Sequence, residues 1–368
     1  MKRKLLMATT AATVLAGLAL VCLSGCANLG YYWQSASGHL KMMGAARPVD
    51  DWLADSSATP RLKERLVLSQ RIRGFAVTAL QLPDNPSYRR YADLQRSAAV
   101  WNVVAAPPLS LTLRTWCFPV TGCVGYRGYF DEAEARAEAA RVAAQGDETS
   151  VYPVPAYSTL GWLNWAGGDP LLNTFIHYPE GELARLIFHE LAHQVVYAKG
   201  DTMFNESFAS AVERLGGRLW LETQAGEAAR KDYEAFDARR RQFRALTQAN
   251  RVRLERIYEE KEPSVPGPRA QDAMKIIAMK EFREQYAQLR DSWGGDPARF
   301  RGYDQWVAQA NNASFGALAA YDALVPGFEA LFEREGRDWA RFYDAVRQLA
   351  ALPKEERHRK LKQGEPGA

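Results

Sequence analysis

The residues best suited to chemistry form one short run, His189-Glu190-Leu191-Ala192-His193. On a helix, side chains four positions apart project from the same face, so both imidazoles can reach one Zn²⁺ ion. Glu190 can then take a proton from a metal-bound water, whose pKa the ion lowers toward neutrality. The run therefore predicts a hydrolytic zinc site with Glu190 as the general base.

A catalytic zinc site needs a third protein ligand and one open position. The metzincin pattern is excluded, because it requires Gly and His where this chain has Val196 and Lys199. Glu206 is the better candidate, since it lies near the start of a second helix that can return antiparallel after Gly200. The alternative is a first-turn carboxylate that only complements the helix dipole. Glu213 falls on the same helical face and could accept a hydrogen bond from a ligand histidine.

Other polar side chains are weaker candidates. Asn311 and Asn312 could orient the substrate backbone, or they could only cap a helix. Tyrosine hydroxyls could stabilise a developing oxyanion as neutral donors, although each tyrosine could equally belong to the core or its rim. The tyrosines considered are Tyr126, Tyr129, Tyr157 and Tyr197. We select Tyr157 as the catalytic candidate.

The first 26 residues are a different kind of sequence. A basic start at residues 2–4 precedes an apolar stretch and the ending Leu-Ser-Gly-Cys. This pattern predicts a secretory signal over residues 1–25, and the ending resembles the bacterial lipobox, which implies acylation of Cys26 and a membrane anchor. The alternative is an ordinary signal with an incidental cysteine. Ala27 after the cysteine resembles the sorting rule for the periplasmic face of the outer membrane.

Two cysteines remain in the mature chain, Cys117 and Cys123. In an oxidising compartment two such thiols favour a disulfide, and the Pro and Gly between them can make the necessary turn. Free buried thiols or half of a metal site are the alternatives, and a zinc knuckle would need a second cysteine pair.

Composition and patterning indicate the elements that must hold these residues. The 368-residue chain has 47% hydrophobic residues, and its Lys+Arg 47 and Asp+Glu 43 are interspersed, which gives no sign of nucleic-acid binding. Apolar spacing predicts a helix from Glu180 to Lys199 and another from Met203 to Leu215, ended by Gly216-Gly217. A strand from Val151 to Leu160 precedes them.

We expect a mixed α/β (α+β) zincin-like fold. A small sheet around residues 109–161 should pack against the zinc helix, and a largely helical part over residues 218–352 should close the cleft. The expected divisions are the signal peptide 1–25, the metallopeptidase 26–352 with a catalytic part at 26–217, and a polar tail at 353–368.

The strand over Val151 to Leu160 is expected to be an edge of that sheet. Pro153 and Pro155 cannot donate to a central ladder, which favours an edge position. An exposed edge offers its backbone groups to an extended peptide. We therefore expect Ala156, Tyr157 and Ser158 to lie beside the metal, with Ala156 and Ser158 contacting substrate.

The zinc motif followed by Asn-Glu-x-Phe-Ala resembles the gluzincins, the class of thermolysin and aminopeptidase N. The chain departs from that class because only 12 residues separate His193 from Glu206, and no Gly-x-Met-Glu-Asn segment is present. More closely, nearly all of the mature sequence resembles the bacterial family of predicted aminopeptidase lipoproteins. The segments that carry this resemblance are Leu82-Pro83-Asp84-Asn85, Val100-Trp101-Asn102-Val103, Trp116 to Cys123, Tyr126-Arg127-Gly128-Tyr129, Ala156-Tyr157-Ser158-Thr159-Leu160-Gly161, the zinc motif and Asn311-Asn312-Ala313.

The sequence thus predicts a Zn²⁺-dependent peptidase of the bacterial cell envelope, with peptides as substrates. The resemblance further implies aminopeptidase action. A lipid-anchored binding or scaffold protein that keeps the fold without turnover is the alternative, although the intact Glu190 argues against it. Hydrolysis of other amides stays open.

Overall fold

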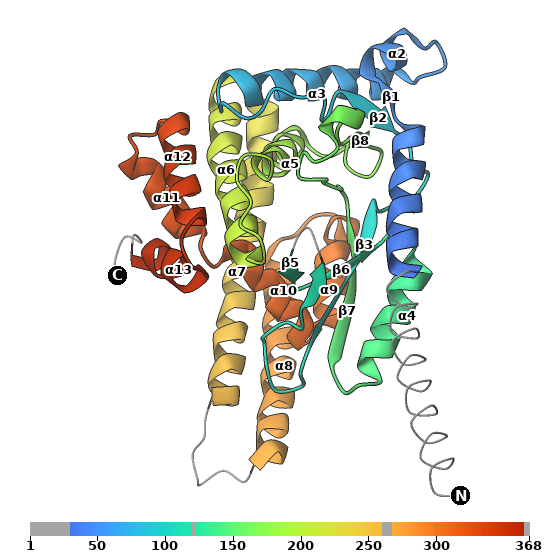
Figure 1. Ribbon diagram of the computed structural model, residues 1–368. Helices are drawn as coiled ribbons and strands as arrows, with labels where there is room; N and C mark the ends of the chain where they lie inside the picture. The colour runs from blue at the N-terminus through green and yellow to red at the C-terminus, as the bar shows by residue number, and fades with distance from the viewer. Residues whose placement is uncertain (1–29, 119–121, 260–266, 364–368) are drawn as a thin grey trace, which may run out of the picture. The chain divides into compact units, whose positions relative to one another are not determined.

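The structure is a computed structural model that describes residues 30–118, 122–259 and 267–363 (Figure 1). The chain divides into one unit up to Ala45 and a second from Ala46 onward. In the first unit, residues 30–45 are helical. The predicted signal peptide over residues 1–25 and the predicted lipidation site Cys26 lie outside the described residues. Within the described part, no helix is both long and apolar enough to span a membrane.

A three-stranded antiparallel sheet lies within the second unit. Its order is β6-β3-β7, and the β3–β7 register runs from Val100 opposite Val154 to Ala106 opposite Glu148. Every residue of β3 is buried, because strands flank it on both sides and α4 and α10 pack on it. The bounds are β3 (Val100–Ala106), β6 (Arg127–Tyr129), β7 (Glu148–Val154), α4 (Glu132–Ala143) and α10 (Asn312–Asp322).

The sheet begins earlier in the sequence than expected, and residues 107–115 are not a strand. Pro107 and Pro108 end β3, because proline has no N–H to give to a ladder. The chain then turns back, and the Arg114 N–H donates to the Ala105 carbonyl at 2.8 Å.

Two smaller sheets complete the strand content of the described residues. In the β4–β5 hairpin, Cys117 faces Cys123 across the pair, and the two form a disulfide. The other sheet has the order β1-β2-β8. The bounds are β1 (Arg47–Pro48), β2 (Arg90–Ala92), β4 (Trp116–Phe118), β5 (Gly122–Val124) and β8 (Leu171–Leu172).

The helix that carries the zinc motif packs mainly on other helices, which corrects the expectation that it lies on the sheet. Its principal neighbour is α6, and α3 and α7 flank it. It also ends earlier than predicted. The Asn205 side chain bonds both the N–H and the C=O of Ala198, so residues 194–200 form a connection tied to α6. The bounds are α3 (Pro60–Thr78), α5 (Glu180–Ala192), α6 (Thr202–Thr223) and α7 (Glu227–Glu259).

Gly216 and Gly217 do not interrupt α6, contrary to the prediction. A Cβ at Gly216 would lie 2.5 Å from Leu80 Cδ1, and one at Gly217 would lie 2.7 Å from Arg185 Cγ. Gly216 therefore allows the segment after α3 to approach α6, and Gly217 allows α5 to approach it, and this close packing offsets their weak helix propensity.

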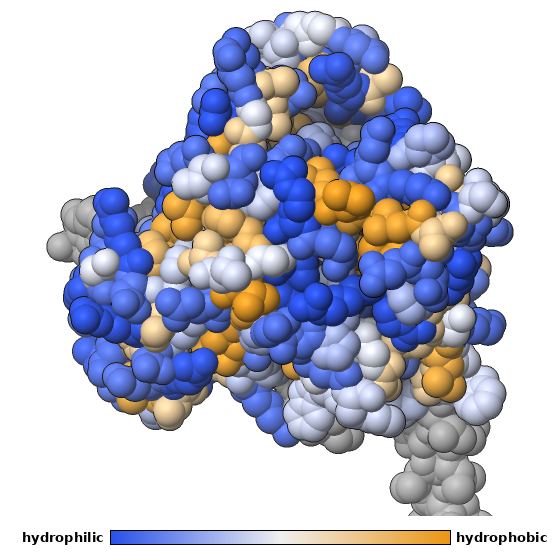
Figure 2. All heavy atoms as spheres, turned by 90° about the horizontal axis from the view of Figure 1, so that it is seen from above, coloured by the Kyte–Doolittle hydropathy of each residue, from blue (hydrophilic) through white to orange (hydrophobic). Residues whose placement is uncertain are grey.

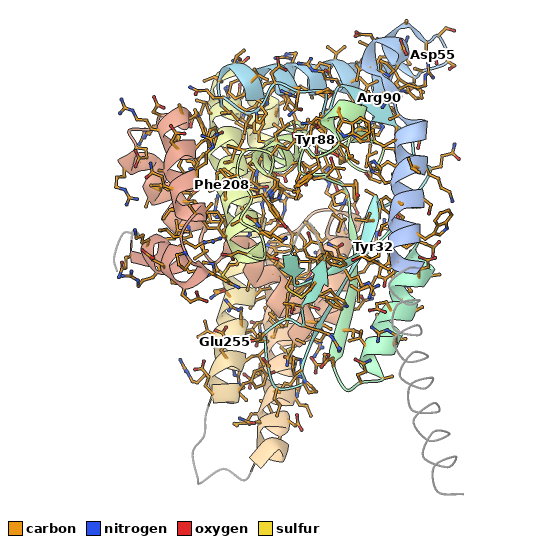
Figure 3. All side chains as sticks on the ribbon, in the orientation of Figure 1. Tyr32, Asp55, Tyr88, Arg90, Phe208 and Glu255 are labelled. Carbon is orange, nitrogen blue, oxygen red and sulfur yellow. A yellow bond between two sulfur atoms is a disulfide. The ribbon has the colours of Figure 1, made fainter. Side chains whose placement is uncertain are left out.

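The C-terminal part is largely helical, as predicted. The helices α7 and α8 run side by side (Figure 1) and enclose a cluster that includes Phe243 and Phe282. Phe208 of α6, labelled in Figure 3, packs against Phe328 and Phe342 with ring centroids 5.7 and 6.0 Å away. The remaining bounds are α2 (Val49–Ala54), η1 (Asn164–Ala166), α8 (Gly267–Ser292), η2 (Pro297–Phe300), α9 (Arg301–Gln309), α11 (Val325–Arg334), α12 (Trp339–Ala350) and α13 (Lys354–Gln363).

The expected polar tail contains the helix α13, which is a correction. Leu361 of this helix is buried, and the buried Arg357 lies 3.4 Å from Asp201, the N-cap residue of α6. His358 also contacts the Asp201 carboxylate, at 2.9 Å. The charged composition of this segment gave no indication of these contacts.

Hydrophilic side chains cover most of the face shown in Figure 2, and apolar side chains gather in separate patches.

Candidate metal centre

Three predicted ligands come together where α5 faces α6. The His189 and His193 Nε2 atoms lie 3.3 and 3.6 Å from one carboxylate oxygen of Glu206. One donor atom from each residue lies within 4.8 Å of the other two. Spacing of four residues places the imidazoles on one face of α5, and the antiparallel return of α6 brings up the carboxylate. Two imidazoles and one carboxylate, all buried, match the donor set of catalytic zinc sites.

Glu213 holds the first histidine, as the sequence predicted. Its carboxylate lies 3.0 Å from His189 Nδ1, which leaves Nε2 directed toward Glu206. Arg185, only 3% exposed, contacts the other oxygen of Glu213. Burial alone would raise the pKa of Glu213, but the charge of Arg185 and the contact with His189 hold it well below its usual range.

Glu206 is also held in its charged form. Burial opposes ionisation, yet the charge of His193 and the hydrogen bonds from both histidines lower its pKa to about 2. Burial alone would lower the pKa of His189, but the carboxylates of Glu206 and Glu213 raise it well above its usual value. Without a metal, the cluster therefore keeps a proton on an imidazole. A bound cation would take over the role of that proton.

The support of this cluster extends to α7. Arg240 makes two hydrogen bonds to the Glu182 carboxylate, at 3.0 and 2.6 Å, and Glu182 lies 3.6 Å from Arg185. A continuous chain of charge contacts thus runs from α7 through Arg185 and Glu213 to His189.

Glu190 differs from its neighbours. No side chain in the described ranges donates a hydrogen bond to its carboxylate. Burial raises its pKa, and the charges of His189 and His193 only partly oppose this. A carboxyl group with a raised pKa and no fixed partner is suited to accept and release a proton.

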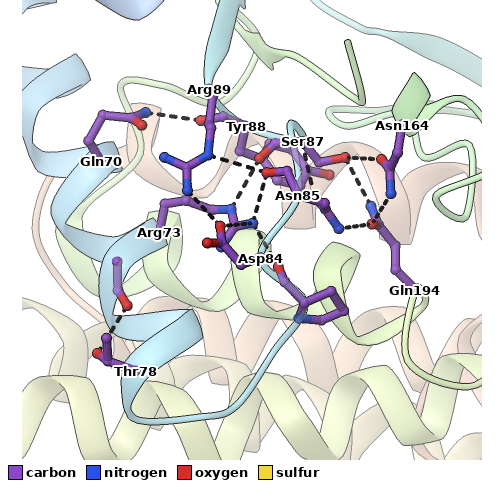
Figure 4. Close-up of polar contacts among 12 residues, drawn as sticks. Gln70, Arg73, Thr78, Asp84, Asn85, Ser87, Tyr88, Arg89, Asn164 and Gln194 are labelled. Carbon is purple, nitrogen blue, oxygen red and sulfur yellow. Dashed lines mark hydrogen bonds and ion pairs between the residues drawn. The ribbon is translucent and has the colours of Figure 1, made fainter. Parts of the chain in front are cut away.

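A second polar cluster adjoins the motif and was missed from the sequence (Figure 4). Gln194, next to His193, accepts hydrogen bonds from Asn85 at 2.7 Å and Asn164 at 3.3 Å. Its amide nitrogen donates to Ser87 Oγ at 3.2 Å and to Asp169 at 3.4 Å. Gln194 thus links the loop before β2 to the loop before β8.

Asp169 is the centre of this second cluster. Its carboxylate is 1% exposed and accepts from the Thr159 N–H at 3.0 and 3.1 Å, with Ser158 Oγ at 3.5 Å. It has no ion-pair partner among the described residues. Burial therefore prevails over these hydrogen bonds and raises its pKa to about 6. A signal existed, because Asn85, Ser158 and Thr159 all belong to segments that carried the family resemblance.

Tyr88 is another residue that sequence reasoning missed. Its φ of 64° is unusual for a bulky residue, and strain of this kind gathers at functional sites. The phenol is buried, and its hydroxyl has no hydrogen-bond partner among the described residues. Burial and the nearby charges of Glu190 and Asp169 raise its pKa well above 10, so it stays neutral.

The strand β7 is an edge of its sheet, as expected, but it ends at Val154. Ala156 is buried, and Tyr157 packs on Phe130 with ring centroids 5.1 Å apart. Ser158 and Gln194 both contact the carboxylate of Asp169, which therefore lies between them. The placement of these three residues against a substrate stays a prediction.

Tyr197 is electrostatically coupled to Glu206 of the candidate metal centre. Burial and the charge of Glu206 raise its pKa to about 12. It therefore joins Tyr157 as a candidate neutral donor.

The structure shows Asn311 as the N-cap of α10, and substrate binding by Asn311 and Asn312 stays a prediction. Its side chain accepts from the Ser314 N–H at 3.1 Å and donates to the Thr149 carbonyl at 2.8 Å. The Asn312 amide donates to the carbonyls of Pro107 and Pro108. Both asparagines use their polar atoms to fasten α10 to the sheet and its following loop.

A protein-family model described as "Putative aminopeptidase" matches residues 30–361. No curated protein and no solved structure matches the chain.

Proposed function

The chain belongs to the putative aminopeptidase family, and from this premise we propose that it is a zinc-dependent peptidase that removes residues from the amino end of peptides. Membership in the family supports peptidase activity. The convergence of His189, His193 and Glu206 on one point carries the proposal that the activity depends on zinc.

The surrounding residues have separate roles in this proposal. His189, His193 and Glu206 would hold zinc, which supplies a Lewis acid and lowers the pKa of a bound water. Glu213 fixes the orientation of His189 through Nδ1. Glu190 accepts the proton of the attacking water and delivers it to the departing amine, a task for which its raised pKa is suited.

We further propose that the protein acts in the bacterial cell envelope. In this proposal the signal over residues 1–25 is removed and Cys26 carries acyl chains. The support is the residue pattern alone. Replacing Cys26 with Ala should move the protein from the detergent phase to the aqueous phase. Unchanged partitioning would remove the lipid anchor from the account.

Peptide-library profiling of the zinc-loaded protein tests the function. The matched control is Glu190→Gln, which keeps the volume of the side chain and removes the base. We expect the control to retain zinc and to lose about 10²–10⁴-fold in turnover. Cleavage confined to the amino end would support aminopeptidase action. Equal activity in both proteins would refute the role of Glu190, and no cleavage by either would favour the silent binding protein.

A further inference from the structure

A cavity of about 590 Å³ lies between the three-stranded sheet, α7, α10 and the first turn of α6. Its volume falls within the range of pockets that bind small ligands or side chains, roughly 300–1,000 Å³. The metal ligands are not part of its lining. The cavity is therefore a separate space whose relation to the metal centre has to be established from the helix that borders both.

The helix α6 connects the cavity to the metal centre. Thr202 and Met203 line the cavity, and Glu206 follows them by four and three positions. Because residues three and four apart lie on the same helical face, Glu206 stands one turn, about 5.4 Å, along the face that borders the cavity. A peptide held at the metal centre would thus have this space beside it.

Polar and apolar atoms share the wall of the cavity about equally. Its apolar part includes side chains from β3, from the segment 107–115 and from α6, among them Val104, Leu113 and Met203. Two tyrosines present their rings while their hydroxyls are engaged elsewhere. Asn102 donates to the Tyr152 hydroxyl at 3.4 Å, and the Tyr258 hydroxyl donates to Asn312 at 2.8 Å.

Charge gives no reason to expect an ionic occupant. The lining includes two cationic and two anionic side chains, Arg251 and Lys354 against Glu255 and Glu259. Arg251 and Glu255, the latter labelled on α7 in Figure 3, pair at 2.5 Å. Because these opposite charges are equal in number, the apolar part of the wall is the part suited to an uncharged side chain.

We propose that this cavity binds a large apolar side chain of the peptide substrate, next to the bond that is cleaved, and so sets sequence preference. The proposal rests on the proposed function and adds a substrate class to it. Burying such a side chain would contribute binding free energy in proportion to its apolar area. Peptides with leucine or phenylalanine beside the cleaved bond should be preferred over those with alanine or glycine.

Filling the cavity tests the proposal. Ala317 lines it from α10, and Ala140 is an exposed helical residue of α4 that serves as the matched control. Ala317→Trp should lower kcat/KM for leucine and phenylalanine peptides by about 10–100-fold and leave alanine peptides within about threefold. Ala140→Trp should change neither. An equal loss for all peptides, or no loss, would overturn the proposal.

A second variant covers the case in which the tryptophan does not fit. Leu113→Ala enlarges the cavity and should shift preference toward phenylalanine and tryptophan peptides. An unchanged preference would count against the cavity.

Binding must also be measured without turnover, so that failure of the proposed function can be recognised. In the Glu190→Gln background, titration calorimetry with a leucine peptide should show weaker binding when Ala317→Trp is added, at unchanged zinc content. If no variant cleaves peptides yet this binding difference persists, the peptidase function fails and the cavity assignment stands. If Ala317→Trp does not change the affinity for the leucine peptide, the assignment of the cavity fails.

Discussion

Two pairs of buried or half-buried carboxyl groups beside the motif helix differ in what surrounds them. Glu206 and Glu213 lie on α6 and contact histidines and Arg185, so their pKa values are lowered despite burial. Asp169 has no cation in contact with it, and at Glu190 the charges of His189 and His193 do not outweigh burial, so the pKa values of both groups are raised. Burial acts alike on all four groups. The contacting cations therefore decide which carboxyls form a fixed negative site and which can exchange protons.

The largest expected effect is the loss of zinc binding when a histidine that contacts the ionised Glu206 or Glu213 is removed. The wild-type protein should bind about one zinc ion per chain, and His189→Ala or His193→Ala should abolish tight binding, because two remaining ligands are too few. Metal analysis after dialysis measures this. His177→Ala, outside the cluster, is the control, and full zinc retention by either ligand variant would break the assignment.

The supporting carboxylate should have a smaller effect. Glu213→Gln leaves all three donors in place but removes the charge that orients His189, so zinc affinity should fall about 10–100-fold. Competition with a chelator measures the affinity. Glu222→Gln, an exposed site on the same helix, should bind zinc as the wild type does. Equal affinity in both variants would show that Glu213 only serves Arg185.

The raised pKa of Asp169 predicts that the stability of the protein depends on pH. The pKa of Asp169 is about 6 in the folded state against an ordinary 3.8, so the native protein binds more protons between about pH 4 and 6. Its ionisation therefore costs stability as pH rises through this window. Asp169→Asn lacks that cost, and its stability relative to wild type should rise by on the order of 2 kcal/mol from pH 4 to 6.

Denaturant unfolding at several pH values measures this difference, and Asp84→Asn is the control. Asp84 is exposed, and its pKa is lowered by Arg89. The change in stability that Asp84→Asn causes should therefore have the opposite sign and should vary with pH only below about pH 4. A flat difference for Asp169→Asn across the window would mean that the carboxyl has a partner that offsets its burial.

The smallest effect separates packing from substrate binding. Asn311→Ala removes the cap of α10 and the contact with Thr149, and should lower the free energy of unfolding by about 1 kcal/mol. Zinc content and KM should stay unchanged. A raised KM at unchanged stability would support the substrate-binding interpretation.

The sequence predicted the ligand cluster because its geometry is local. His189 and His193 share a helical face, and Glu206 and Glu213 share another, so only one pairing of helices was needed. The elements around that pair were harder to predict. Gly216 and Gly217 indicated a helix end, since propensity does not reveal that Leu80 and Arg185 require close approach there.

Residue spacing could not predict the second cluster, because it joins distant segments. Asn85, Asp169 and Gln194 are far apart in sequence and have no spacing that indicates a shared site. The polar composition after residue 353 likewise concealed the contact between Arg357 and Asp201. Local periodicity carries no information about such pairings.

The most direct test of the account is anomalous diffraction at the zinc absorption edge from crystals of the zinc-loaded protein. We predict one anomalous peak, bound by Nε2 of His189, Nε2 of His193 and the Glu206 carboxylate, with Glu190 unbound and facing the open position. A peak elsewhere, or one at this site without Glu206 as a ligand, would contradict the central claim.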